Sequence, residues 1–268
     1  MTNRLDEPSK SDESVPTIRR LTGARLRLAV ASIALIVVAS GIFYYQFFYN
    51  PQVILATDYG EQLEHTLPDG SQVTLNANSS LKYYARTPRS VRLDGEAFFE
   101  IEKMVRTKEK FNVWTTDLAV TVLGTSFNVN TRDNRTQVYL EEGKVSLALE
   151  QEEKASEIIE MEPGDLIAYS KKDKKLSEKK KNVSALENAS WKEGSLIFKD
   201  TPLVKALSDI EDIYGIQFVY QQEDVEGEVI SGGVPIKNLD VTLVTLSEVY
   251  GIQIVKKGNR YVLNVVEN

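Results

Sequence analysis

The chain has 268 residues, of which 42% are hydrophobic, so it is long enough to bury one large core or two modest ones. It contains no cysteine, which excludes disulfides, thiolate metal sites and cysteine nucleophiles. The net charge is −7, and because residues 1–27 hold six basic against four acidic residues, the remainder holds 26 against 35, or −9. An acidic balance of this size argues against nucleic acid as a partner of the larger part.

An apolar stretch near the N-terminus is the first predicted element. Residues 28–48 (LAVASIALIVVASGIFYYQFF) contain no charge over 21 positions, enough for a helix to span a bilayer. The stretch is longer than the apolar core of a signal peptide, and aromatic residues follow in its second half, as at a membrane interface. It therefore predicts a retained transmembrane helix rather than a cleaved signal.

The charges around this helix predict its orientation. The next basic residue after it is Lys82, whereas four arginines flank its N-terminal side: Arg19, Arg20, Arg25 and Arg27. The positive-inside rule then places the N-terminus in the cytoplasm and the bulk of the chain outside. Residues 1–27 are polar without an apolar period, and we predict a short disordered cytoplasmic tail there.

Residues 57–170 alternate apolar and polar positions in short runs such as QVTL, SVRLDG, LAVTVL and SFNVNT, as half-buried strands require. Turn sequences separate the runs, among them PDG, DG, EG and PGD. We predict an all-β domain, with a roll, a sandwich and a short β-solenoid left open.

Residues 171–188 contain seven lysines between positions 171 and 181 and few apolar residues. Like charges repel and extend a chain, so the segment predicts a charged linker. Contact with anionic lipid headgroups or with an acidic partner is the alternative.

Residues 189–268 contain an internal repeat. Leu203, Leu207, Ile210 and Tyr214 recur 36 positions later as Leu239, Leu243, Leu246 and Tyr250, with the spacing of one helix face. Both copies continue into Gly-Ile-Gln, where a glycine suits the left-handed position that ends a helix and a strand follows. The repeat predicts a small α+β domain with a duplicated βαβ unit, both helices on one face of a small sheet.

Catalytic patterns are missing from the sequence. It contains no phosphate loop, no Gly-x-Ser-x-Gly elbow and no dinucleotide fingerprint, and its single histidine, His65, has no cysteine or second histidine to act with. The acidic pairs around Gly95 and Gly143 fall at turns, where carboxylates are solvated. We predict no enzyme activity on other molecules, no cofactor and no metal site.

Six blocks in order carry a family resemblance: YGEQLEHTLPDGSQVTLNANSSLKYY, RSVRLDGEAFFEI, FNVWT, VTVLGTSFNVNT, VYLEEGKVSL and MEPGDLIAY. They resemble the FecR family, and the C-terminal repeat is similar to the secretin and TonB short N-terminal module found in one branch of it. The resemblance implies an anti-sigma factor in the inner membrane of a Gram-negative bacterium. Its periplasmic part would contact the signalling domain of a TonB-dependent outer-membrane transporter of iron chelates or glycans, and its cytoplasmic part an extracytoplasmic-function sigma factor.

The cytoplasmic segment departs from the family pattern, because members usually carry several tens of helical residues there and this chain offers about 25 polar ones. Either the sequence starts at an internal methionine, or the protein keeps the sensor without the usual inhibitor. An anchored periplasmic scaffold or a glycan-binding module without sigma binding is the rival function, while a periplasmic hydrolase would need a catalytic constellation that the sequence does not supply.

Two candidate sites follow. In some family members the chain cuts itself at a Gly-Thr bond of the corresponding block, which here is Gly124-Thr125, with plain architecture as the alternative reading. Strand residues around it, Val120, Val122, Phe127 and Val129, are expected on the inner face, with Gly124 at a bulge or close backbone approach. The second site is a partner-docking edge at Val229, Ile230, Ser231, Gly232, Gly233 and Val234.

Overall fold

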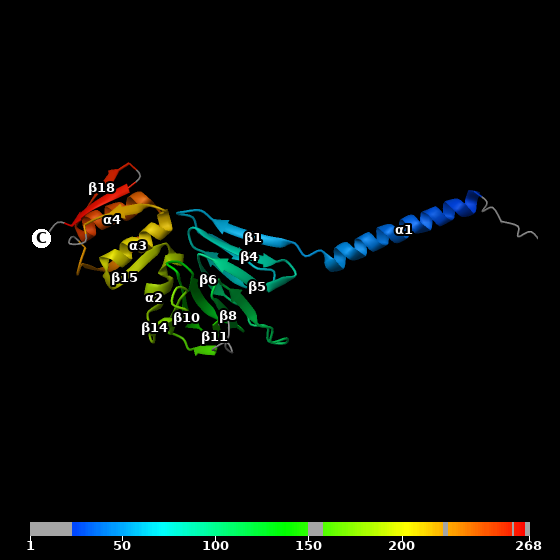
Figure 1. Ribbon diagram of the computed structural model, residues 1–268, viewed down its shortest axis with the longest axis horizontal. Helices are drawn as coiled ribbons and strands as arrows, with labels where there is room; N and C mark the ends of the chain where they lie inside the picture. Colours follow the sequence, from blue (N-terminus) through cyan, green and yellow to red (C-terminus); the bar gives the residue numbers. More distant parts are fainter. Residues whose placement is uncertain (1–22, 150–157, 222–224, 259, 266–268) are drawn as a thin grey trace, which may run out of the picture. The chain divides into compact units, whose positions relative to one another are not determined.

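The computed structural model describes residues 23–149, 158–221, 225–258 and 260–265, in two units that meet between Tyr49 and Asn50 (Figure 1). The first unit holds one long helix, α1 (Gly23–Phe48). Its residues Leu26–Phe48 have a mean hydropathy of 2.3, and the helix is long and apolar enough to cross a membrane. Arg25 and Arg27 fall in its first turns, whereas Arg19 and Arg20 lie outside the described residues.

The second unit begins with a sandwich of two seven-stranded sheets (Figure 1). All neighbouring strands are antiparallel except β5 and β7, which are parallel. The first sheet has the order β1 (Gln52–Thr57), β4 (Ser79–Tyr84), β5 (Thr87–Asp94), β7 (Phe111–Trp114), β8 (Leu118–Val122), β11 (Val145–Leu149) and β12 (Ile158–Met161). The second has the order β14 (Lys175–Lys180), β13 (Leu166–Ser170), β10 (Arg135–Glu142), β9 (Ser126–Asn130), β6 (Glu96–Glu100), β3 (Gln72–Leu75) and β2 (Leu63–Thr66).

Alternating residues from both sheets fill one core, as the sequence pattern predicts. Phe99 and Phe127 stack with ring centroids 5.1 Å apart, and Phe111 from the facing sheet lies 6.2 Å from Phe99. The four positions expected on the inner face around Gly124 are all buried: Val120, Val122, Phe127 and Val129. The all-β prediction is therefore confirmed, and of the open alternatives the sandwich is the one observed.

The charged linker predicted over residues 171–188 is wrong for much of its length. Residues 175–180 form β14, which pairs with β13 from Leu166 to Ser170 and closes one edge of the second sheet. Leu176 packs against the core, and a sheet edge tolerates lysines because solvent reaches its outer side. Residues 185–189 then form the short helix α2 (Ala185–Ala189), which is followed by the 3₁₀ turn η1 (Ser190–Glu193).

The C-terminal part contains the predicted duplicated unit. The first copy is β15 (Ser195–Pro202), α3 (Leu203–Tyr214) and β16 (Gln217–Val219); the second is β17 (Val229–Pro235), α4 (Leu239–Tyr250) and β18 (Ile252–Lys257), and β19 (Arg260–Val265) follows. Both helices end at a left-handed glycine, Gly215 with φ 63° and Gly251 with φ 68°.

The predicted single sheet is not observed. β15 pairs with β17 in a two-stranded sheet, while β19 inserts between β16 and β18 in a separate three-stranded sheet. The first strands of the two repeats, β15 and β17, thus pair with each other in one sheet. The last strands, β16 and β18, belong to the other sheet, where β19, which lies outside the repeat, takes the position between them.

Candidate functional site

The C-terminal domain packs against the outer face of the second sandwich sheet through a small apolar cluster. Phe98 on β6 and the nearby Ala77 meet four residues of the C-terminal domain, and all six are buried: Ala77, Phe98, Ala189, Trp191, Ile213 and Ile236. Because Phe98 points away from the sandwich core, it would be exposed without this domain. The two domains therefore share a buried contact, which we call the junction.

Polar contacts fix the junction on both sides of this cluster. The Gly60 N–H donates to the carbonyl of Ile213 at 2.7 Å, and Gln62 Nε2 donates to the carbonyl of Trp191 at 2.9 Å. The ammonium of Lys192 lies 3.7 Å from the ring centroid of Phe98. Backbone groups held in this way define the position of α3 against the sandwich.

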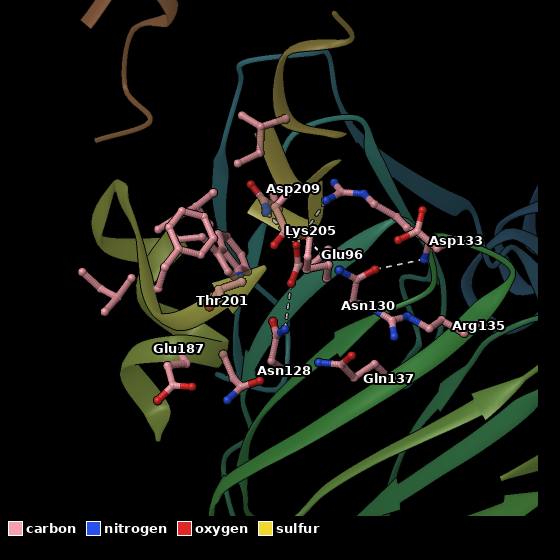
Figure 2. Close-up of a pocket in the computed structure, with 18 residues that line it drawn as sticks. Glu96, Asn128, Asn130, Asp133, Arg135, Gln137, Glu187, Thr201, Lys205 and Asp209 are labelled. Carbon is pink, nitrogen blue, oxygen red and sulfur yellow. Dashed lines mark hydrogen bonds and ion pairs between the residues drawn. The ribbon is translucent and has the colours of Figure 1, made fainter. Parts of the chain in front are cut away.

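A polar pocket of about 200 Å³ lies beside the cluster, and Glu96 is at its centre (Figure 2). The buried carboxylate of Glu96 accepts hydrogen bonds from Asn76 Nδ2 at 2.7 Å, Asn128 Nδ2 at 2.8 Å and Arg132 Nη1 at 3.2 Å. Arg132 also donates to the carbonyl of Ala77. A buried charge needs such partners, so removing one of them should leave Glu96 uncompensated.

Helix α3 brings one carboxylate, Asp209, to this pocket and a second, Asp212, to the adjacent pocket that Arg132 also lines. Burial raises the pKa of Asp209 although Lys205 pairs with it, and the negative charges of Glu96 and Asp133 act in the same direction. Burial likewise raises the pKa of Asp212 to about 6, against the opposing effect of Arg132. Acidic groups from both domains thus lie around Arg132 and Lys205 at the junction. The geometry of the junction should therefore depend on whether these carboxyl groups are ionised.

The Gly124-Thr125 bond lies in the turn between β8 and β9. The Thr125 hydroxyl is buried and donates to the carbonyl of Lys144 at 3.0 Å. A Cβ on Gly124 would lie 2.5 Å from Cβ of Lys103, so the predicted close backbone approach is observed. Next to the bond is a cavity of about 790 Å³ lined by five lysines: Lys103, Lys110, Lys144, Lys179 and Lys181. The threonine side chain therefore has a structural partner, and the cleavage hypothesis stays a prediction.

Two family models match the second unit in chain order. The model described as FecR protein matches residues 54–146, and the model described as FecR, C-terminal, matches residues 195–263. The chain belongs to the FecR family.

Solved structures agree with this assignment. Two crystal structures of a candidate anti-sigma factor from Parabacteroides distasonis ATCC 8503 are similar to the chain, each with 28% identity and a TM-score of 0.65. They cover 81% and 80% of this chain and 100% of their own. No curated protein matches the sequence.

The predicted docking edge forms most of β17, and its residues divide between the two faces of that strand. Ile230 and Val234 point into the core of the C-terminal domain, whereas the Val229 side chain is 54% exposed. Ser231 donates a hydrogen bond to Asp200 Oδ1 at 3.1 Å. Among the described strands β17 pairs with β15 alone, so a second strand has one edge at which to add.

No local sequence pattern indicates the junction residues. Glu96 belongs to the acidic residues around Gly95 that the turn pattern explains, and neither Arg132 nor Asp212 carries a local pattern that distinguishes it from a solvated residue. The one available signal is Phe98, which follows Ala97 and precedes Phe99 in a run without alternation. Such a run indicates a strand covered on both faces.

Proposed function

We propose that this FecR-family chain is a transmembrane anti-sigma regulator of the inner membrane. In this proposal the C-terminal bulk lies in the periplasm and receives a signal from a TonB-dependent outer-membrane transporter, and the N-terminal segment acts on an extracytoplasmic-function sigma factor. The observation that carries the proposal is the order of parts on one chain: a helix able to span a membrane, a FecR match and a FecR C-terminal match. The similarity to a candidate anti-sigma factor supports it.

The fold suggests how a signal would travel. A partner that binds the C-terminal domain acts on β17 or on the helices beside it, and α3 contacts the sandwich through the junction. The sandwich in turn joins α1 through the peptide segment at Asn50. A change in α3 would therefore reach the membrane helix through the junction, the sandwich and one short peptide connection.

Sigma-factor recovery tests the regulatory part of the proposal. The tagged full chain is expressed in its native host and extracted in mild detergent. A sigma factor should co-purify with it, but not with a variant that lacks residues 2–22 and keeps α1. If the chain is a regulator, deletion of its gene should also change transcription from promoters that depend on that sigma factor. If the full chain retains no sigma factor and transcription is unchanged, the anchored scaffold or glycan-binding module becomes the better reading.

Transporter docking is tested on β17. Ile230→Lys would be a poor choice because Ile230 is buried in the core, whereas Val229→Lys adds charge at an exposed position. We expect Val229→Lys to weaken binding of the purified transporter signalling domain at least about tenfold, since a charge in an apolar contact is poorly solvated. The matched control is Val255→Lys on β18, also about half exposed at 49%. Equal affinity for both variants and the parent chain would remove β17 from the proposal.

A further inference from the structure

The loop between β6 and β7 is an exposed, basic segment at one end of the sandwich. Residues 102–110 cross from the second sheet to the first, and they carry four basic side chains, Lys103, Arg106, Lys108 and Lys110, all exposed. Val105 lies among them with 76% of its surface exposed, the largest fraction of any large hydrophobic residue described. An apolar side chain flanked by basic ones is the composition found at membrane-water interfaces.

Strand directions place this loop at the end of the sandwich where the chain enters from α1. β1 begins at Gln52, which pairs with Tyr84 at the end of β4, so the β4–β5 turn lies beside the entry point. β7 runs parallel to β5, with Asn112 opposite Ser90, and it therefore also begins at this end. The loop that precedes β7 thus lies at the entry end.

Two sets of hydrogen bonds tie the entry point to the loop. The Arg86 N–H donates to Asn50 Oδ1 at 3.0 Å, and the Ala85 N–H donates to the carbonyl of Pro51 at 3.0 Å. Three positions later, the buried guanidinium of Arg89 donates to the carbonyls of Glu102 and Glu109, each at 3.2 Å, which clamps both stems of the loop.

The peptide connection to α1 is short. Only Tyr49 separates Phe48, the last helical residue, from Asn50, and two residues extend at most about 7 Å. If α1 spans the bilayer, the aromatic residues at its end mark the headgroup level. Chain connectivity keeps Asn50 close to that level, and the hydrogen bond from the Arg86 N–H keeps Arg86 close to Asn50.

The charges of this end suit an anionic surface. Arg86 and the four basic residues of the loop stand against the two acidic residues within the loop, Glu102 and Glu109, in a part of the chain that is acidic as a whole. The strand ends beside the loop add Glu100, Glu142 and Lys144. None of these five basic side chains forms an ion pair with any residue that the structure describes. Unpaired Lys and Arg near a bilayer are attracted to anionic headgroups.

We propose that residues 102–110 form a membrane-docking loop that binds anionic phospholipid on the side of the bilayer where the sandwich lies. Arg86, Lys103, Arg106, Lys108 and Lys110 contact headgroups, and Val105 enters the interface between them. The inference rests on the membrane anchor of the proposed function. It gives the sensor a second attachment, which restricts its rotation about the peptide segment that follows α1.

The chain offers a direct probe, because it has no cysteine and a single introduced thiol can be labelled cleanly. The full chain with Val105→Cys carries an environment-sensitive fluorophore and is reconstituted into nanodiscs of phosphatidylcholine alone or of a mixture rich in phosphatidylglycerol. We expect emission at shorter wavelength, with quenching by a lipid-bound quencher, in phosphatidylglycerol discs only. The probe control is Val249→Cys on α4, which is 68% exposed and should not shift.

Charge reversal tests the headgroup contacts. Arg106→Glu with Lys110→Glu should abolish the shift of the Val105 probe, whereas Lys172→Glu with Lys175→Glu, the same charge change at exposed lysines of the opposite end, should leave it intact. An equal shift in both lipids, or one that survives Arg106→Glu with Lys110→Glu, would overturn recognition of anionic lipid.

Failure of this inference can be told apart from failure of the anchor. A chain that enters the discs without any shift of the Val105 probe overturns the docking loop and leaves the anchor standing. A chain that does not co-purify with discs at all overturns both.

Discussion

Asp212 shows at the scale of one residue how the junction responds to pH. Burial raises its pKa from 3.8 to about 6, so the folded state favours the protonated carboxyl. The resulting stabilisation is complete below the unfolded value of 3.8 and is lost as the pH rises through about 6. The junction should therefore be held more tightly in mildly acidic than in neutral solution.

Asp212→Asn removes this dependence because the amide stays neutral. After allowance for solvent screening of a partly exposed group, we expect the variant to be more stable than the parent chain by about 1 kcal/mol at neutral pH, with the difference vanishing below about pH 4. Urea unfolding at several pH values measures it. Glu64→Gln, at an exposed carboxylate of β2, is the control and should show no such trend. A variant less stable than the parent at neutral pH would contradict the argument.

Thr125 carries the second residue-scale prediction. If the chain cuts itself at Gly124-Thr125, purified protein contains two fragments joined in the folded unit and separated by denaturation, Thr125→Ala remains whole, and Thr125→Ser still cuts. Mass spectrometry of denatured protein distinguishes these cases. A parent chain recovered as a single full-length species would leave Thr125 with its structural role, the hydrogen bond to the Lys144 carbonyl.

At the scale of elements, α3 and α4 are repeats of one unit with different surroundings. Both end at a left-handed glycine, but a Cβ on Gly215 would lie 2.7 Å from the ring of Tyr59, whereas a Cβ on Gly251 would meet none of the described residues within 4 Å. The C-terminal end of the first helix is thus packed against Tyr59, and Gly251 has no such neighbour among the described residues.

The two glycines make a matched pair of variants. Gly251→Ala costs only the backbone strain of the left-handed region, about 1 kcal/mol, while Gly215→Ala adds a clash with Tyr59 worth roughly 1–3 kcal/mol more. Thermal or urea unfolding measures the difference. In a Tyr59→Ala background the excess should disappear, and an excess that persists would show that the ring does not cause it.

At the scale of the whole molecule, the proposal depends on the direction in which α1 crosses the membrane. A cysteine at exposed Lys82 or Lys172 should react with an impermeant reagent in intact spheroplasts, because the sandwich then lies outside the plasma membrane. A cysteine at Ser9 should react only after permeabilisation. The reverse pattern would place the folded unit in the cytoplasm and remove any route from a transporter.

The sequence alone determined the parts and their order. An uninterrupted apolar run, period-two alternation and a repeated helix face each depend on neighbouring residues, so the spanning helix, the strands and the two βαβ units could be predicted locally. The tertiary structure decided which strands pair and what covers them. It made residues 175–180 an edge strand rather than a linker, separated the repeats into two sheets, and brought Arg132 close to both Glu96 and Asp212 from distant positions. Strand pairing and buried charge depend on long-range contacts, which no local pattern encodes.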